Sequence, residues 1–380
     1  MMEKFDVTVS VWNRYWSFPL IRGLVSDGYK VQALGTSRSK PASTSYLQNW
    51  PSAFLTQAMH RLPFGHDFFA GCAIEAYETF AARHVEGTRC FWGWGNHHLK
   101  AFERAKKLGI PVILECGSTH CDWGFQRLSA EYAKRGISLD QSLFMKLIPK
   151  MKAEYELADR ICLPSSFTAK TFVESGIPES KLALNPYGAD VEFWKQVERR
   201  GWPGKDRPFV FVCAAQLSLR KGVMYLLEAW KQLAGLNAEL WLVGGIDREI
   251  SGLLRDLPEN VKILGYKSHT ELRDLYAKCD VYVLPSLEEG MARSVLEAMA
   301  AGLPVIVTEE TGLADVIKDG EGGWFVPSAD SEVLAAQMRE TYELGGDLPD
   351  IGILVRKKVE AFTWLEYGKR AAKWLHDFHI

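Results

Sequence analysis

Short apolar runs alternate with longer stretches of helical periodicity along most of the chain, and this alternation restricts the fold more than any other feature. The runs are rich in Val, Ile, Leu and Phe and are largely uninterrupted, which is typical of strands buried in a parallel sheet. Strands that alternate with helices indicate an α/β, doubly wound architecture. The clearest runs are FDVTVSV (5–11), YKVQAL (29–34), IPVILEC (110–116), DRICLP (159–164), PFVFVCA (208–214), AELWLVG (238–244), KILGY (262–266), DVYVLP (280–285) and PVIVT (304–308).

The pattern occurs twice, which predicts two domains. One series ends near Pro186 and the other begins at Pro208, after the polar stretch KQVERRGWPGKDR, whose glycine, proline and charges suit a linker. The 380 residues are enough for two hydrophobic cores. We therefore expect domains over 1–195 and 196–364, facing each other across an interdomain cleft. Ligands of such folds bind at the carboxyl ends of the strands.

Composition and charge exclude several classes of protein. The net charge of -2 argues against a nucleic-acid partner that depends on a strongly basic surface. The seven cysteines follow no disulfide-scaffold spacing, so a reducing compartment is expected. The first residues resemble a strand rather than a signal peptide, and no run approaches about 18 apolar residues. We expect a cytoplasmic protein, with peripheral contact at the inner face of the cell membrane left open.

The segment EEGMARSVLEAMAAGLPVIVT (288–308) suggests a binding site. Glu289 lies in a loop before a helix expected from about 292 to 301, and Glu297 follows about two turns later. The amides from Gly290 to Arg293 are expected to be free and would suit a phosphate. Two carboxylates beside an anion site would then bind sugar or ribose hydroxyls. Taken alone, Glu289 would be interpreted as a solvated loop charge and Glu297 as a carboxylate on a helix surface.

A second segment, CAAQLSLRKGVMYLLEAW (213–230), carries two adjacent cations. A strand is expected to end near Ala214 and a helix to start near Gly222, so Arg220 and Lys221 lie where the loop meets the helix. Two cations at a helix N-terminus favour a diphosphate. The alternative is that both are solvated surface charges, and their position after a buried strand counts against it.

Taken in order, several motifs resemble the retaining glycosyltransferases of family 4, which have the GT-B architecture of two facing Rossmann-like domains. The motifs are Glu289-x7-Glu297, the following AMAAGLPVIVT, DGEGGWFVP (319–327), Lys221-Gly222, LADRICLPSSFTAKTFVESGIPESKLALNPYGADVEFW (157–194) and VKILGYKSHTELRDLYAKCDVYVLPS (261–286). The resemblance covers residues 100–330 well and the first hundred residues weakly. It implies that residues 365–380 form a last helix that crosses back to the first domain.

The resemblance also implies roles for single residues. Glu289 would contact the hydroxyls of the donor sugar, and Glu297 would hold the ribose of the nucleotide. Lys221 would neutralise the diphosphate. Three residues would bring their backbone close to the diphosphate and the sugar: Gly290, Met291 and Ala292.

One position departs from the family pattern. The family often has an arginine shortly after the strand, in a "GRL…KG" arrangement, whereas this chain has Gln216 there. One cation for the diphosphate is therefore missing from its usual place. We expect Arg220 to compensate for it, with Gln216 still beside the donor.

The run PVILECGSTHCDWG (111–124) combines side chains that suit metal binding or catalysis. A zinc site through Cys116, His120 and Cys121 lacks a second ligand pair, and a cysteine nucleophile lacks support elsewhere in the chain. The resemblance implies that His120 lies near the donor sugar. The alternative is a hydrogen-bonded loop histidine with structural cysteines, and we expect no metal site.

The first loop holds candidates for the acceptor side. Many members of the family have a Gly-rich turn there, whereas this chain has Arg14, Tyr15 and Trp16. Aromatic rings at this place could stack on a sugar acceptor or simply close the cleft.

These observations lead to one expected function and three alternatives. We expect a retaining, metal-independent glycosyltransferase acting on a saccharide or lipid-linked acceptor in cell-surface polysaccharide or glycolipid synthesis. No cofactor is expected, and the co-substrate is a nucleotide-diphosphate sugar, with UDP-sugars slightly favoured over GDP-sugars. The alternatives are a nucleotide-sugar epimerase, a phosphorylase, or a non-catalytic nucleotide-sugar-binding subunit. The sequence does not indicate an oligomeric state.

Overall fold

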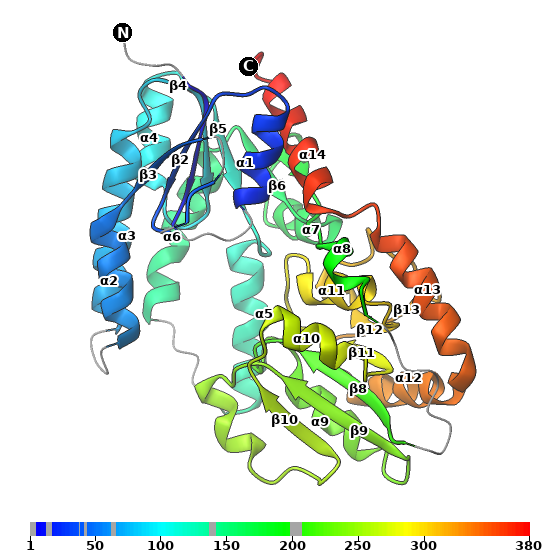
Figure 1. The fold of residues 1–380 in the computed structure, drawn as a ribbon. Helices are drawn as coiled ribbons and strands as arrows, with labels where there is room; N and C mark the ends of the chain where they lie inside the picture. Colours follow the sequence, from blue (N-terminus) through cyan, green and yellow to red (C-terminus); the bar gives the residue numbers. More distant parts are fainter. Residues whose placement is uncertain are drawn as a thin grey trace.

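The computed structural model describes residues 5–12, 17–37, 39–41, 44–61, 66–136, 142–197 and 207–380, with side chains except at 58–61, 66–67 and 142–146. It contains two parallel sheets, each flanked by helices (Figure 1). This confirms the expected α/β class with two doubly wound units. Among the described residues, no helix is long and apolar enough to cross a membrane.

The first sheet has seven parallel strands in the order β3-β2-β1-β4-β5-β6-β7. Neighbouring strand residues face opposite layers: Phe91 packs on the side of α3 and α4, and Trp92 on the side of α1 and α14. The strands are β1 (Phe5–Val11), β2 (Val31–Gly35), β3 (Ser45–Gln48), β4 (Thr88–Trp94), β5 (Val112–Glu115), β6 (Arg160–Leu163) and β7 (Leu182–Leu184). The helices are α1 (Ser17–Ser26), α2 (Trp50–Arg61), α3 (His66–Arg83), α4 (Leu99–Lys107), α5 (Cys121–Lys134), α6 (Ser142–Leu157), α7 (Ser166–Glu174) and the 3-10 helix η1 (Glu179–Lys181).

The second sheet has six parallel strands in the order β10-β9-β8-β11-β12-β13. Helices α9 and α12 pack together, as do α11 and α13. The strands are β8 (Phe209–Ala214), β9 (Ala238–Val243), β10 (Val261–Gly265), β11 (Val281–Leu284), β12 (Val305–Thr308) and β13 (Gly323–Val326). The helices are α8 (Val191–Trp194), α9 (Val223–Lys231), α10 (His269–Tyr276), α11 (Arg293–Ala300), α12 (Ser331–Leu344), α13 (Leu348–Val359), α14 (Trp364–His376), η2 (Arg248–Leu254), η3 (Glu309–Thr311) and η4 (Gly345–Asp347).

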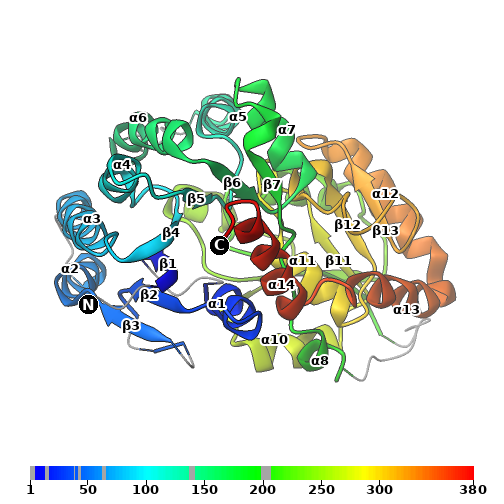
Figure 2. The ribbon, with the colours of Figure 1, turned by 90° about the horizontal axis from the view of Figure 1, so that it is seen from above.

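The chain passes between the two sheets at two adjoining places. Ala189 and Thr363 form a parallel bridge there, and the Ala189 amide donates to the Phe362 carbonyl at 2.9 Å. Helix α14 then runs beside α1 (Figure 2). A Cβ on Gly23 would lie 2.3 Å from the backbone of Gly368, so only glycine permits this approach. Most of the expected linker, residues 198–206, lies outside the described residues.

Helix α5 connects the two halves of the molecule. It follows the loop after β5 of the first sheet, yet it extends beside the second sheet (Figure 1). Its side chains bond second-domain residues through the pairs Arg127–Glu310 (3.2 Å), Glu131–Tyr225 (2.8 Å), Tyr132–Glu249 (2.7 Å) and Arg135–Glu228 (2.6 Å). The loops at the carboxyl ends of β5, β8 and β11 consequently meet.

Candidate active site

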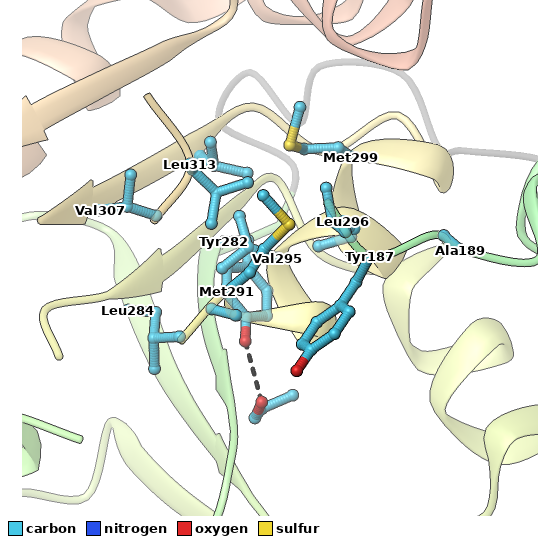
Figure 3. Close-up of a cluster of buried hydrophobic side chains, with 14 of the residues drawn as sticks. Tyr187, Ala189, Tyr282, Leu284, Met291, Val295, Leu296, Met299, Val307 and Leu313 are labelled. Atoms are coloured by element: carbon cyan, nitrogen blue, oxygen red, sulfur yellow. Dashed lines mark hydrogen bonds between the residues drawn. The ribbon is translucent and has the colours of Figure 1, made fainter. Parts of the chain in front are cut away.

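The loop after β11 is anchored to the hydrophobic core by Met291. Met291 is 3% exposed, and its side chain lies among Leu284, Val295 and Leu313 (Figure 3). Tyr282 closes this cluster with a hydroxyl that donates to the Ala214 carbonyl at 2.8 Å. Because the Met291 side chain points into the core, only its backbone is available to a ligand.

The loop after β8 touches the loop after β11. Gly222, the N-cap of α9, has a φ of 69°, and a Cβ there would lie 1.9 Å from the Pro285 carbonyl oxygen. This contact places Lys221 beside Glu289, and the two form an ion pair with side chains 13% and 9% exposed. Ser286 donates to the same carboxylate at 3.2 Å. The expected donor residues Lys221 and Glu289 are therefore in direct contact.

Arg220 joins this pair from the same loop. Its Nη1 lies 3.1 Å from Glu288 Oε2 and 3.5 Å from Glu289 Oε2, and it also donates to the Glu288 carbonyl at 3.1 Å. Burial alone would raise the pKa of Glu289, but Lys221 and Arg220 together hold it below its usual value. Glu289 in turn raises the pKa of Arg220. Glu289 is thus kept ionised between two cations.

Glu297 has a different environment on helix α11. Burial raises its pKa to about 7, and Arg293 offsets this only in part. Within the described part of the chain, the Glu297 carboxylate has no hydrogen-bond partner. The Glu297 side chain is half-buried, and a partly buried carboxylate without a partner is ready to accept hydrogen bonds from a ligand.

The amides at the start of α11 differ from the expectation in one respect. The Ala292 amide donates to the Thr311 carbonyl at 2.9 Å, so the expectation that every amide from Gly290 to Arg293 is free was wrong. The reason is that the loop after β12, which contains η3, packs against the start of α11. Among the described residues, the amides of Gly290 and Met291 have no partner, which keeps them as candidates for binding an anion.

The first-domain loop after β5 lies directly against this site. A Cβ on Gly290 would lie 2.0 Å from the Gly117 carbonyl oxygen, and Ser165 Oγ donates to the Gly290 carbonyl at 2.6 Å. Thr119 donates to Glu288 Oε1 through its amide at 3.1 Å and its hydroxyl at 2.7 Å. Residues from both sheets therefore build one site.

The chain is similar to known proteins in sequence and in fold. Residues 208–343, which hold Arg220, Lys221, Glu289 and Glu297, match the family model described as Glycosyl transferases group 1. The second half of the chain is therefore similar to the group 1 glycosyltransferases. The two sheets of the chain have the GT-B architecture: the Anabaena protein HepE, solved with UDP and glucose, superposes with a TM-score of 0.66 over 98% of this chain and 99% of its own, at 15% identity.

Two curated relatives match over part of the chain. The amylovoran biosynthesis glycosyltransferase AmsK of Erwinia amylovora is 27% identical over 56% of this chain and 54% of its own length. The capsular polysaccharide biosynthesis glycosyltransferase CapM of Staphylococcus aureus is 25% identical over 62% of this chain and 66% of its own. The chain spans about half the length of the first curated relatives it matches.

The His120 ring is engaged by residues of the first domain. Its Nδ1 accepts the Asp122 amide at 3.3 Å and so caps α5, and its ring packs against Tyr155 and Phe172. Burial lowers its pKa, offset in part by Asp122. Among the described residues, no ring contact or hydrogen bond joins His120 to Glu289 or Lys221. A role for His120 near the donor sugar stays a prediction.

The two neighbouring cysteines have the properties of core residues. Burial raises the pKa of Cys116 to about 12 and that of Cys121 to about 11, which disfavours the reactive thiolate. Among the described residues, no three His, Cys, Asp or Glu side chains are grouped so that they could hold a metal ion.

The structure describes the predicted donor-side residue Gln216 but not the predicted acceptor-side residues. Gln216 is exposed, and its amide nitrogen donates to Asp247 Oδ1 at 2.6 Å beside Gly245. In the described part of the chain, Gln216 makes no hydrogen bond to Arg220 or Lys221. The acceptor-side candidates lie outside the described residues: Arg14, Tyr15 and Trp16.

Sequence reasoning missed Glu288 and Thr119. Glu288 precedes the predicted Glu289, and its side chain is only 6% exposed between Thr119 and Arg220. The acidic pair in "LEEG" was the available signal for Glu288. For Thr119 there was none, because its partner is 169 residues away in the chain.

Proposed function

We propose that the protein is a retaining, metal-independent glycosyltransferase of family 4 that moves a sugar from a nucleotide-diphosphate donor to an acceptor hydroxyl. The observation that carries the proposal is the ion pair of Lys221 and Glu289 beside Arg220, where the loops after β8 and β11 meet. Retention of stereochemistry is proposed from the family resemblance alone.

The two cations suit the charge that develops during transfer. As the bond from sugar to diphosphate breaks, negative charge builds on the leaving phosphate. Glu288 and Glu289 hold Arg220 and Lys221 at this site, and both cations can stabilise that charge once the diphosphate replaces a carboxylate as their partner. The amides of Gly290 and Met291 would add neutral donors. Fixed cations of this kind can act in place of a divalent metal ion.

The two carboxylates suit the hydroxyls of the donor. Glu289 is kept ionised, so it can accept hydrogen bonds from the transferred sugar. Glu297 has no hydrogen-bond partner among the residues that the structure describes, and ribose hydroxyls would supply the missing hydrogen bonds. Donors of that kind also stabilise the ionised form, so nucleotide binding would lower the pKa of Glu297 from about 7.

The relatives suggest the classes of substrate. HepE was solved with UDP and glucose, which supports a UDP-sugar ahead of a GDP-sugar as donor. CapM and AmsK are named as biosynthesis glycosyltransferases, CapM for a capsular polysaccharide. We therefore propose a role in polysaccharide synthesis with a saccharide or lipid-linked acceptor. We also propose a location in the cytoplasm, at the inner face of the membrane.

A thermal-shift screen with UDP, GDP, UDP-glucose and GDP-mannose tests this proposal. A nucleotide at a hundred times its Kd stabilises a protein by about 2.7 kcal/mol, which is a readily measured shift in Tm. We expect a rise with UDP or UDP-glucose, without added metal. If no nucleotide or nucleotide-sugar raises the Tm, the donor site is wrongly assigned. Release of nucleotide from the donor only when acceptor is added would then separate transfer from epimerisation.

A further inference from the structure

Glu288 is a buried carboxylate whose two oxygens are bound from different domains. Oε1 accepts the amide and the hydroxyl of Thr119, at 3.1 and 2.7 Å, from the first domain. Oε2 lies 3.1 Å from Arg220 Nη1 of the second domain. Its side chain is 6% exposed, so these groups rather than water balance its charge.

The bond from Thr119 depends on how the two domains meet. It lies beside the closest approach between them, where Gly290 leaves no room for a Cβ against Gly117. Thr119 is 3% exposed, and moving the first-domain loop away would break both of its bonds to Glu288. The Thr119–Glu288 contact therefore exists only when the two loops are together.

Arg220 is shared between two carboxylates and, under the proposed function, a diphosphate. Glu288 and Glu289 both face its guanidinium. A diphosphate must draw Arg220 away from them, which leaves Glu288 without its cation. The two Thr119 donors reduce the cost of that exchange because they still satisfy Oε1.

We propose that Glu288 is a positioning residue that couples closure of the first-domain loop (116–120) to the availability of Arg220 for the diphosphate of the donor. With Thr119 in place, Glu288 can release Arg220. Without Thr119, Glu288 retains Arg220 and opposes phosphate binding. This inference rests on the proposed function and adds a link between the domains.

Binding of UDP measured by calorimetry, with GDP used instead if only GDP binds, tests the link in four proteins: wild type, T119V, E288Q and T119V/E288Q. Val has the shape of Thr without the hydroxyl, and Gln has the shape of Glu without the charge. We expect T119V to weaken UDP binding by at least about tenfold, the order expected for one buried hydrogen bond to a charge. E288Q should bind UDP at least as tightly as wild type, and T119V should have no further effect in the E288Q background.

Hydrogen exchange supplies a readout that loss of stability alone would not change. In wild type, UDP should increase protection of amides in the 116–120 loop, and in E288Q that increase should disappear. E259Q is the matched control, because Glu259 is exposed and has no partner among the described residues. If T119V weakens UDP binding equally with and without the charge on Glu288, the coupling is disproved. The coupling is also disproved if UDP still increases amide protection of the 116–120 loop in E288Q. If wild type binds neither nucleotide, the proposed function fails instead.

Discussion

Glu289 and Glu297 lie eight residues apart and have opposite pKa shifts. Lys221 and Arg220 outweigh burial and lower the pKa of Glu289, whereas burial raises that of Glu297 to about 7. The β11–α11 segment thus presents one carboxylate that is always ionised near neutral pH and one that is poised to change its charge. Pairs of carboxyl groups separated in this way are typical of functional sites.

The pKa of Glu297 predicts a pH-dependent effect of E297Q on stability. Glu297 holds its proton in the folded state up to about pH 7, but in the unfolded state only up to about 4.5. The folded state therefore binds more protons between these values, and the contribution of Glu297 to stability is lost as the pH rises from 4.5 to 7. We therefore compare the free energy of unfolding of E297Q with that of wild type. From pH 4.5 to pH 8, we expect this difference to shift in favour of E297Q by about 1–3 kcal/mol. Urea unfolding at both pH values measures this shift, and an equal difference at both would contradict the shifted pKa.

Substitution of Gly290 tests the contact between the domains. A Cβ at this position would lie 2.0 Å from the Gly117 carbonyl oxygen, so the two loops must separate in G290A. We expect a loss of at least about tenfold in nucleotide-sugar turnover, because small misplacements in a site have large effects on rate. Gly252 is the matched control, since a Cβ there meets nothing within 4 Å and its φ is unremarkable. If G290A and G252A are equally active, the close approach has no functional role.

Arg220 and Gln216 can be tested together. R220A should weaken UDP binding by about tenfold, as expected for loss of one cation from a diphosphate site. Restoring a cation at the usual family position, in R220A/Q216R, should recover part of that loss. Calorimetry with UDP gives both values, and R220A binding UDP as tightly as wild type would rule out the compensating role. Asp247 bonds Gln216 and is positioned to hold the new arginine.

The sequence was informative where structure depends on local pattern. Buried strands, the loop cations Arg220 and Lys221 and the glutamates at 289 and 297 could all be located from runs and spacing. Their mutual pairing could not, because it arises where separate loops meet: Lys221 is 68 residues from Glu289, and Thr119 is 169 from Glu288. No local pattern indicates such contacts, since they depend on how two separately formed sheets pack.

The orientation of the His120 ring was hidden for a related reason. The sequence indicated a histidine after a strand, but its ring direction is set by α6 and α7, which supply Tyr155 and Phe172. The engaged amide of Ala292 likewise depends on Thr311, which comes from a different loop. In both cases a neighbouring element contacts a group for which the sequence alone indicated no partner.

Two substitutions at His120 separate a cap from a role in transfer. Asparagine can also cap a helix, so H120N should keep the bond from the Asp122 amide, whereas H120A loses both cap and ring packing. We expect H120A to lower the free energy of unfolding by about 1–3 kcal/mol, and H120N by less. If His120 acts only as a cap, H120N should transfer sugar at close to the wild-type rate in a donor-turnover assay. If H120N folds stably but loses at least about tenfold in rate, the ring acts on the donor as the family resemblance implies.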